Sequence, residues 1–300
     1  MRKPLVAVLM ATFNGEKYLK EQLDSILNQK NVNIHLYISD DGSTDQTIYI
    51  LKQYFKNYPK QFKKLYHTNH CHPAKNFLSI IKKIDINYKY YAFSDQDDLW
   101  LRNKLNRGIS KINSGNDLYG SKTINVDKNL KFLGYSPVFE KKKNFNNAIL
   151  QSFAGGNTYM FNNKIFKLLK IYSPLKVTMH DWWIYMFTTF LGGKVYYDHK
   201  SFIKYRLHEN NVNGHNLGLI NKLKRIYIAL RNQYKIWNDL NIKNINKILH
   251  LGTKNNIKIL KDFIYLRKLK FPILLNKINI YRQTRLDQFL LKVGFFLNKI

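Results

Sequence analysis

The sequence predicts an α/β protein built on a mostly parallel, doubly wound sheet that is flanked by helices and followed by a basic helical appendage. Three observations support this prediction. Apolar runs of strand length alternate with segments of helical periodicity over residues 5–94. Acidic turns follow two of these runs. The order of elements changes after residue 150, and the chain becomes helical and strongly basic from about residue 215.

The first part of the chain predicts alternating strands and helices. The apolar run LVAVLM at 5–10 suits a buried strand, because strands of parallel sheets are covered on both faces. A helical pattern follows over 18–27. The other predicted elements are strands at 34–39, 63–68 and 89–94 and helices at 47–55 and 74–84. This βαβαβαβ order is typical of a doubly wound sheet.

The later part of the chain has a different order. Residues 152–162 predict a loop that enters a strand, and residues 179–192 predict a helix with a polar start. Two strands around a turn are expected at 194–198 and 201–208. In 215–300 there are 18 Lys or Arg residues and 3 Asp residues. We therefore expect a first domain at 1–214 and a basic helical C-terminal region at 215–300.

Composition limits the class of protein and its partners. The chain has 300 residues, 50 Lys+Arg, 19 Asp+Glu and a formal charge of +31, and 45% of its residues are hydrophobic, enough for a core. A basic surface suits nucleic acid, anionic lipid or an anionic substrate. No helix-turn-helix, RRM or zinc-finger pattern is present, so nucleic acid is not an expected partner. The single Cys71 excludes an intrachain disulfide and fits a reducing compartment.

The apolar segments do not predict a membrane span. The apolar run near the N-terminus is too short for a signal peptide and leads straight into a patterned domain. The nearest candidate span, WWIYMFTTFLGG at 182–193, is shorter than the about 18–20 apolar residues of a spanning helix. We expect a cytoplasmic protein.

Two acidic clusters follow predicted strands. Asp40 and Asp41 follow the second strand, and Asp95, Asp97 and Asp98 follow the fourth. Ligands of open α/β sheets bind outside the carboxyl ends of the strands, so both clusters would face one crevice. Close carboxylates repel one another unless a cation lies between them, and Mg²⁺ or Mn²⁺ suits this arrangement. A solvated turn is the alternative, which the flanking aromatic residues and the second cluster disfavour.

The segment after the first strand disfavours dinucleotide-binding proteins. ATFNGEKYL stands where a dinucleotide-binding protein would carry GxGxxG, so a dehydrogenase is disfavoured. The segments VAVLMATFNGEKYLKEQLDSIL, LYISDDGSTDQT and FSDQDDLWLRNKL instead resemble family 2 glycosyltransferases of the GT-A fold. GGNTYMFN, HDWW and YRLHENN continue the resemblance in the same order over roughly residues 4–212. The closest resemblance is to the rhamnosyltransferase-like branch, which builds bacterial cell-surface polysaccharide such as lipopolysaccharide or capsule.

The resemblance implies a donor site and a metal site. The metal would be Mn²⁺ or Mg²⁺, bound by the DxD motif. Asp97 is its implied ligand, Asp95 would contact ribose or metal, and His208 would lie near the metal and diphosphate, although a structural histidine is the alternative there. Asp40 would bind the pyrimidine base. The implied nucleotide-sugar-binding residues are Thr12, Asn14, Glu16, Asp40, Lys75, Asn76 and Asp95.

The resemblance also implies a catalytic base and an acceptor site. Asp181 in HDWW resembles the general base, and a helix N-cap is the alternative reading. Trp182 and Trp183 are expected to pack on sugar faces. Gly156 and Asn157 would contact acceptor or donor, or would form a tight turn. The implied reaction is an inverting single displacement in which the metal stabilises the departing diphosphate.

The sequence leaves several alternatives open. The donor could be dTDP-rhamnose or a UDP-hexose, and the acceptor a saccharide or a lipid-linked saccharide. The basic C-terminal region could attach the protein to the inner face of the cytoplasmic membrane, or could form a helical lid or dimer surface. A nucleotidyltransferase would need a Gly-rich basic loop after the first strand, and a non-catalytic polysaccharide-assembly partner would lose Asp97 or Asp181.

One segment departs from the family pattern. NHCHPAKNF at 69–77 replaces a glycine-bearing loop with His70, Cys71 and His72. Zinc is disfavoured there, because adjacent side chains diverge and no second cysteine is available.

Overall fold

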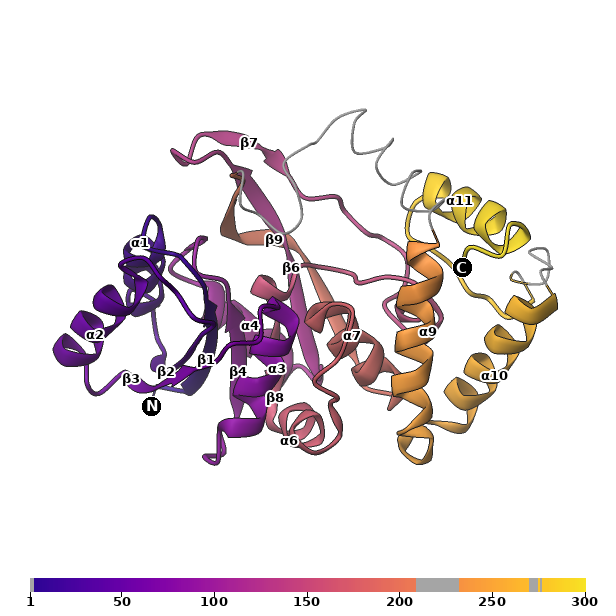
Figure 1. The fold of residues 1–300 in the computed structure, drawn as a ribbon, viewed down its shortest axis with the longest axis horizontal. Coiled ribbons are helices and arrows are strands. Elements are labelled where there is room, and N and C mark those ends of the chain that lie inside the picture. Colours follow the sequence, from indigo (N-terminus) through magenta and orange to yellow (C-terminus); the bar gives the residue numbers. More distant parts are fainter. Residues whose placement is uncertain (1–2, 209–231, 270–274, 276) are drawn as a thin grey trace. The chain divides into compact units, whose positions relative to one another are not determined.

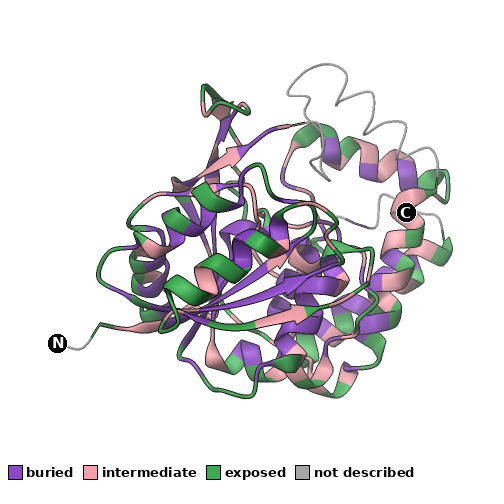
Figure 2. Cartoon of the chain, turned by 60° about the vertical axis from the view of Figure 1, so that its left-hand side comes forward, coloured by how far each residue is buried: buried purple, intermediate pink, exposed green. Residues whose placement is uncertain are grey.

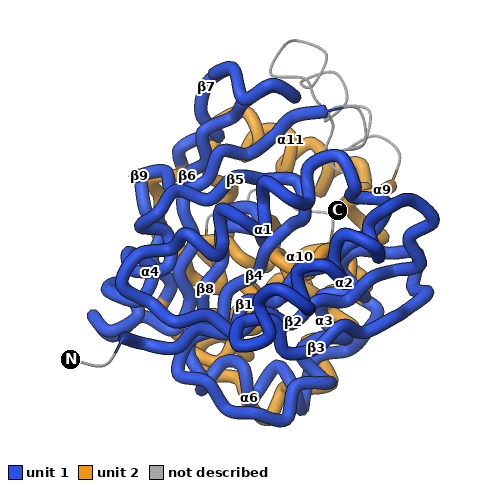
Figure 3. Tube along the Cα trace, turned by 90° about the vertical axis from the view of Figure 1, so that its left-hand side faces the viewer, with its two compact units in different colours: residues 1–138, 154–176, 195–208 blue, residues 139–153, 177–194, 209–300 orange. Residues whose placement is uncertain are grey.

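The chain forms two compact units, and each is described by itself. The computed structural model describes residues 3–208, 232–269, 275 and 277–300. The first unit comprises residues 1–138, 154–176 and 195–208, and the second comprises residues 139–153, 177–194 and 209–300 (Figure 3). The expected boundary at 214–215 lies outside the described residues, so this division stays a prediction.

The first unit begins with the predicted alternation of strands and helices (Figure 1). Its strands β3-β2-β1-β4 are neighbours in that order, and all three pairings are parallel. The apolar run of β1 is fully buried from Val6 to Met10, because helices cover both faces of the sheet. The elements are β1 (Leu5–Thr12), α1 (Leu19–Leu27), β2 (Asn33–Asp40), α2 (Thr47–Asn57), β3 (Phe62–His67), α3 (Pro73–Lys83) and β4 (Tyr90–Ser94). The βαβαβαβ prediction is confirmed.

The sheet continues beyond β4 in the order β8-β6-β9-β5, with β7 paired to β6. Here β6 and β9 are parallel, and the pairings of β8, β5 and β7 are antiparallel. The predicted loop and strand at 152–162 are present as η1 and β8. The elements are β5 (Leu99–Trp100), α4 (Lys104–Asn113), β6 (Leu118–Val126), β7 (Phe132–Tyr135), η1 (Gly156–Thr158), β8 (Met160–Asn162), α6 (Asn163–Tyr172) and β9 (Val195–Arg206).

The expectation of two strands around a turn at 194–208 is wrong. Strand β9 is continuous from Val195 to Arg206. Its pairing with β6 passes from Asp198 to Ser201 while β6 advances by one residue. The turn-like residues between them form a bulge, which lets the strand keep its direction.

Helices pack on the sheet through one apolar face. Figure 2 shows buried strands between helices whose outer sides are exposed. Leu23 and Ile26 of α1 and Leu105 of α4 belong to one buried cluster with the strands. At Gly108 of α4 an added Cβ would lie 2.3 Å from Met160 Sδ of β8, so a larger residue here would require the buried Met160 side chain to move.

The second unit is helical where it is described. The expected helix at 179–192 is α7, whose residues from Trp182 to Phe190 are all buried. The Asn256 side chain donates to the carbonyls of Thr189 (2.8 Å) and Phe190 (3.0 Å), which terminates α7. The elements are α5 (Phe145–Ala148), α7 (His180–Phe190), α9 (Gln233–Asn246), η2 (Leu249–Leu251), α10 (Lys254–Leu269) and α11 (Arg285–Phe296). None of the helices in the described ranges is long and apolar enough to cross a bilayer.

Candidate active site

The loops that follow β1 and β2 are joined by hydrogen bonds. The Asn14 side-chain oxygen accepts from the Thr44 N–H (2.8 Å). The Glu16 N–H donates to Asp45 Oδ2 (3.0 Å), and Glu16 Oε2 accepts from the Gln46 N–H (2.9 Å). Asn14 has a φ of 45°, a left-handed conformation that Asn tolerates better than most residues. The polar groups of Asn14 and Glu16 therefore hold the two loops in a fixed relation.

Asp40 is buried at the end of β2, and its carboxylate is surrounded by donors. Oδ1 accepts from the hydroxyls of Thr12 (2.8 Å) and Ser43 (2.6 Å). Oδ2 accepts from the N–H groups of Gly42 (3.2 Å) and Ser43 (2.8 Å). With 1% of its surface exposed, Asp40 fixes the turn after β2 and orients Thr12. Its contact with a pyrimidine base stays a prediction.

The Asn76 side chain is also hydrogen-bonded within the chain. Its Nδ2 donates to the Ser39 carbonyl (2.9 Å), and its Oδ1 accepts from the Thr68 hydroxyl (3.2 Å). Lys75, one residue earlier in α3, is half-buried. The pKa of His70 is lowered by burial and then by the charge of Lys75, which places this cation beside the 69–72 segment.

Asp41 holds the segment that departs from the family pattern. Its two carboxylate oxygens accept from the N–H groups of His70 (2.5 Å) and His72 (3.2 Å). Cys71 lies between them with a φ of 51° and is exposed. The three side chains do not form a metal-binding cluster in the part of the chain that the structure describes. Asp41, next to Asp40, thus holds the shape of this loop. The sequence pattern did not indicate this role.

Gln96 joins the loop after β4 to the loop after β1. Gln96 Oε1 accepts from the Phe13 N–H, and Gln96 Nε2 donates to the Phe13 carbonyl, each at 2.8 Å. An added Cβ on Gly15 would lie 2.3 Å from Gln96 Oε1, so glycine leaves room for this amide. The loops after β1, β2 and β4 therefore form one connected rim at the carboxyl ends of their strands.

Three carboxylates gather on this rim. Asp95, Asp97 and Asp98 each offer an oxygen, and these atoms lie within 4.8 Å of one another. Asp95 and Asp97 are half-buried, whereas Asp98 is fully buried and accepts from Asn157 Nδ2 (2.6 Å). Gly156 precedes Asn157 in η1 and is buried as well. Hard oxygen donors at these separations fit Mg²⁺ or Mn²⁺, and this is the one such cluster found among the described residues.

The structure brings two of the predicted metal-site residues together. His208 Nε2 lies 2.9 Å from Asp97 Oδ2, although the two residues are 111 positions apart in the sequence. The His208 ring packs on the Tyr18 ring with centroids 5.1 Å apart. The end of β9 therefore supplies an imidazole directly beside the acidic cluster.

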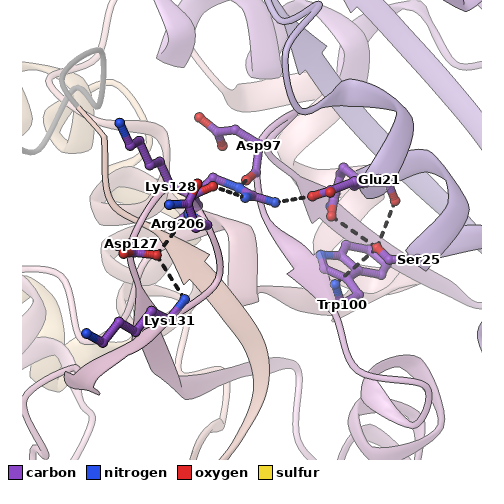
Figure 4. A network of polar contacts seen from close by, with 10 residues as sticks. Glu21, Ser25, Asp97, Trp100, Asp127, Lys128, Lys131 and Arg206 are labelled. Carbon is purple, nitrogen blue, oxygen red and sulfur yellow. Dashed lines mark hydrogen bonds and ion pairs between the residues drawn. The ribbon is translucent and has the colours of Figure 1, made fainter.

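Arg206 is a residue of this site that the sequence analysis did not single out. Its guanidinium, in a side chain 2% exposed, donates to the carbonyls of Asp97 (3.0 Å) and Lys128 (2.7 Å) and forms an ion pair with Glu21 (Figure 4). It also lies over the Tyr18 ring at 4.3 Å. One planar cation thus holds the loop after β4, the turn after β6 and helix α1 together.

Lys104 is a second residue near this site that the sequence analysis did not single out. It is fully buried at the start of α4, with its Nζ 3.6 Å from the centroid of the Trp100 ring. Burial lowers its pKa to about 7, against the opposing effects of Asp98 and Asp95. Burial, together with the charges of Asp97 and Asp95, raises the pKa of Asp98 well above its ordinary value. A buried lysine therefore lies close enough to the acidic cluster for its pKa to respond to Asp98 and Asp95.

Asp181 lies in the second unit, in the first turn of α7. The helix begins at His180, and Asp181 Oδ1 accepts from the Trp182 N–H (2.8 Å). Burial raises the pKa of Asp181 to about 6, against the lowering effects of hydrogen bonds from Trp182 and the Ser152 side chain. A carboxylate with this pKa is largely ionised at neutral pH and accepts a proton more readily than an ordinary aspartate.

The two tryptophans after Asp181 are core residues. Trp182 is 3% exposed and donates from Nε1 to the Ala148 carbonyl (2.6 Å). Trp183 is fully buried and packs against Phe187 with ring centroids 5.7 Å apart. Neither ring has a face open to solvent, which packing on a sugar requires. Their evident physical role is to anchor the start of α7 and so to position Asp181.

The sequence matches a known family. The model for "Glycosyl transferase family 2" matches residues 7–169, more than half of the chain. The chain belongs to this family. The glycosyltransferase is also 32% identical over 296 residues to dTDP-rhamnosyl transferase RfbG of Shigella flexneri, covering 91% of this chain and 100% of that protein. An uncharacterized glycosyltransferase, RT0329, of Rickettsia typhi is 27% identical over 218 residues, covering 69% of this chain and 65% of that protein.

Solved structures share the fold of the glycosyltransferase. The S. aureus protein TarS 1–349 in complex with UDP-GlcNAc aligns with a TM-score of 0.57 and 16% identity, covering 98% of this chain and 90% of that one. The mannosyltransferase PcManGT from Pyrobaculum calidifontis, in complex with GDP-Man and Mn²⁺, aligns with a TM-score of 0.54 and 12% identity, covering 98% and 85%. The predicted GT-A fold is confirmed, as is the prediction of a rhamnosyltransferase-like family 2 enzyme.

Proposed function

We propose that this enzyme transfers rhamnose from dTDP-rhamnose, or alternatively a hexose from a UDP-sugar, to a saccharide of the bacterial cell surface. The observation that carries the proposal is the group formed by Asp95, Asp97 and His208 on the rim after β1, β2 and β4. Such a group suits the diphosphate of a nucleotide sugar held through a divalent cation. The 32% identity to dTDP-rhamnosyl transferase RfbG supports rhamnose as the sugar.

The acidic group would hold a metal ion. Asp97, with Asp95 and His208, would bind Mn²⁺ or Mg²⁺, and the oxygen-rich donor set fits these ions. The bound ion would supply positive charge against the departing nucleoside diphosphate. Thr12, Asn14, Glu16, Asp40, Lys75 and Asn76 belong to the proposed nucleotide site, in which Asp40 and Asn76 act by holding the loops in shape.

Asp181 is the proposed general base. It takes the proton of an acceptor hydroxyl while the acceptor oxygen bonds to the anomeric carbon of the donor sugar and the bond from that carbon to the diphosphate oxygen breaks. The pKa of about 6 for Asp181 suits this role at neutral pH, because the carboxylate is then ionised and close to its proton-accepting range. Gly156 and Asn157 are proposed to shape the sugar site.

The acceptor is proposed to be lipid-linked, at the inner face of the cytoplasmic membrane. The C-terminal helices place exposed apolar side chains among their basic residues, as membrane-bound helices do. These apolar side chains are Ile236, Tyr265, Leu269, Leu286, Phe289 and Phe296. A helical lid or dimer surface would leave the protein in solution when anionic vesicles are sedimented.

Calorimetric titration tests the donor proposal. The purified protein is titrated with dTDP, UDP and GDP, each with Mn²⁺ and again with EDTA. Metal-dependent binding of dTDP with weak UDP binding is the expected result, and it favours rhamnose. Tight UDP binding instead favours a hexose donor. Binding that is unchanged by EDTA would remove the metal role of Asp97, and binding of none of the three would overturn the donor site.

Transfer assays separate the remaining alternatives. A nucleotidyltransferase would release pyrophosphate from a nucleoside triphosphate, whereas the proposed enzyme releases a nucleoside diphosphate from a nucleotide sugar. A non-catalytic assembly partner would release neither. The presence of Asp97 and Asp181 together favours a catalyst.

A further inference from the structure

The end of β6, the turn after it and β7 form a hairpin at the edge of the first unit's sheet, here called the aromatic hairpin (residues 122–138). Strand β7 pairs with β6 and with no other strand in the described ranges. Figure 1 shows the hairpin extending beyond β9 and away from the other strands of its unit. An edge strand of this kind is open to contact along its outer side.

A bulge gathers aromatic side chains on one face of the hairpin. Phe132 lies opposite Val126 and Tyr135 opposite Ile124, with the register shifted between these pairs. The extra residue at Leu133 brings Phe132 and Tyr135 to the same face, although they are three positions apart. Their ring centroids are 5.3 Å apart.

The apolar side chains of the hairpin are exposed. Phe132 is 56% exposed, Tyr135 52%, and Leu133 and Val138 42% each. Four large apolar residues within seven positions are costly to leave in water at the tip of a strand pair. The patch is therefore suited to a partner surface. Gly134 and Pro137 interrupt the segment, and a strand of four residues is a poor template for adding another strand.

The charges around the patch are positive. Lys128 and Lys131 are exposed, and Lys122 Nζ lies 3.8 Å from the centroid of the Tyr135 ring. The acid in this segment, Asp127, accepts hydrogen bonds from the N–H groups of Asn129 (2.8 Å) and Lys131 (2.9 Å) and so stabilises the turn. Aromatic and aliphatic side chains rimmed by lysine match an anionic bilayer, where rings sit at the headgroup level and lysines meet lipid phosphates.

The turn of the hairpin is bonded to the candidate active site. Arg206 donates to the Lys128 carbonyl in the hairpin turn and to the Asp97 carbonyl in the acidic cluster (Figure 4). Both bonds lie within the first unit. A surface that binds the hairpin is therefore held at a fixed relation to the Asp97 loop.

We propose that the aromatic hairpin inserts Phe132, Leu133 and Tyr135 into the headgroup region of an anionic membrane and so presents the acidic cluster to an acceptor carried on a lipid. The proposal rests on the proposed function, because it assumes a lipid-linked acceptor. It assigns to the first unit a membrane contact distinct from that of the basic C-terminal helices.

Vesicle flotation tests this contact. The double variant Phe132→Ser/Tyr135→Ser is compared with Tyr49→Ser/Ile86→Ser, which removes two side chains of similar exposure, 61% and 58%, elsewhere in the same unit. Binding to phosphatidylglycerol-containing vesicles is measured at about 0.1 M and about 0.5 M salt, because high salt screens the charge attraction and leaves apolar insertion by the hairpin and by the C-terminal helices. The C-terminal helices are the same in both variants. The hairpin variant is expected to bind about tenfold more weakly at high salt, and the control variant like the native chain.

A site-specific probe gives a second, independent result. Cys71 is the one cysteine of the chain, so Cys71→Ser combined with Phe132→Cys allows a single environment-sensitive label at the hairpin. Its emission should shift to shorter wavelength with anionic vesicles, and a label at Tyr49→Cys should not shift. Equal flotation of both double variants, or no shift at position 132, overturns the proposal.

Nucleotide titration of the same samples separates this proposal from the proposed function. The hairpin variant should bind dTDP or UDP as the native chain does, because Phe132 and Tyr135 are outside the nucleotide site. If neither protein binds a nucleotide, the proposed donor site is wrong. If both proteins bind nucleotide and the hairpin variant also floats like the native chain, the proposed membrane contact is wrong and the proposed donor site stands.

Discussion

His208 Nε2 lies 2.9 Å from Asp97 Oδ2, which joins the segment just after β9 to the acidic cluster after β4. The contact completes the group proposed to hold a divalent cation. It depends on β9 running parallel to β6 and ending beside the loop after β4, with Arg206 bonded to the Asp97 carbonyl two residues before His208.

Asp97→Asn should abolish metal-dependent nucleotide binding. The substitution keeps the shape of the side chain and removes the negative charge, so the metal site loses its central ligand. Transfer activity is expected to fall by at least about a hundredfold. Calorimetry with dTDP and Mn²⁺ measures the binding. Asp85→Asn is the control, because Asp85 is an exposed acid paired with Lys170. Equal affinity of the two variants would contradict the metal role.

The pH dependence of transfer should report the carboxyl group of Asp181. A general base must be ionised, and burial raises the pKa of Asp181 to about 6. The rate is therefore expected to fall about tenfold per pH unit below pH 6 and to level off above it. Initial rates at saturating donor from pH 4.5 to 8 measure this. A rate that stays constant down to about pH 4.5 would exclude Asp181 as the base.

Asp181→Asn should remove transfer while increasing stability at pH 8. The pKa of Asp181 is raised in the folded protein, so the folded state favours the protonated carboxyl group. The stability that this protonated form contributes at low pH is lost as the pH rises from about 4 to about 6. Above that range the partly buried charge lowers the free energy of unfolding by about 1–3 kcal/mol. The variant, which still offers an oxygen to the Trp182 N–H, should regain this amount. Thermal unfolding at pH 4 and pH 8 measures the difference, and a stability loss at pH 8 would contradict it.

Arg206→Lys should weaken the donor site as well as the fold. A lysine keeps the charge but cannot bond the Asp97 and Lys128 carbonyls and Glu21 together. We expect about 2–4 kcal/mol of lost stability and at least about tenfold weaker nucleotide binding. Arg107→Lys is the matched control, since it breaks the bond to Asp198 away from the acidic cluster. If both variants bind nucleotide equally, Arg206 has only a structural role.

Gly15→Ala and Gln96→Ala should show strong coupling. In the native chain an alanine Cβ at position 15 collides with Gln96 Oε1, so it should displace the amide from Phe13 and weaken nucleotide binding about tenfold. In the Gln96→Ala background the space is open, and the glycine substitution should have little further effect. A double-mutant cycle on nucleotide affinity measures the coupling. Additive effects would show that Gln96 does not transmit the change.

The sequence predicted the first half of the fold well, because that half is encoded locally. Apolar runs such as 5–10 and the helical pattern over 18–27 each reflect a buried strand or an amphipathic helix within about ten residues. Strands β6 and β7 and helices α4 and α6 received no assignment. The end of β6 alternates between buried and half-buried residues, and β7 is exposed, so neither carries a continuous apolar signal.

The sequence likewise predicted some residues of the candidate site and not others. DQDD after a strand predicted the acidic cluster, and its three carboxylates do gather. The motif HDWW suggested tryptophans for a sugar, but Trp182 and Trp183 are buried, because aromatic residues after the polar start of a helix also serve to anchor it. Lys104 and Arg206 carried no local signal that separates them from the other 48 Lys and Arg residues of the chain.

The sequence by itself determined the family, the order of the first strands and the positions of Asp95, Asp97, Asp181 and His208, because these depend on residue type and short spacing. Only the tertiary structure decided that His208 meets Asp97, that Arg206 bonds the Asp97 carbonyl and Lys104 is buried near Asp98, and that Phe132 and Tyr135 share one face. These relations depend on strand register and burial. Both are set by packing between segments far apart in the chain, which no local pattern records.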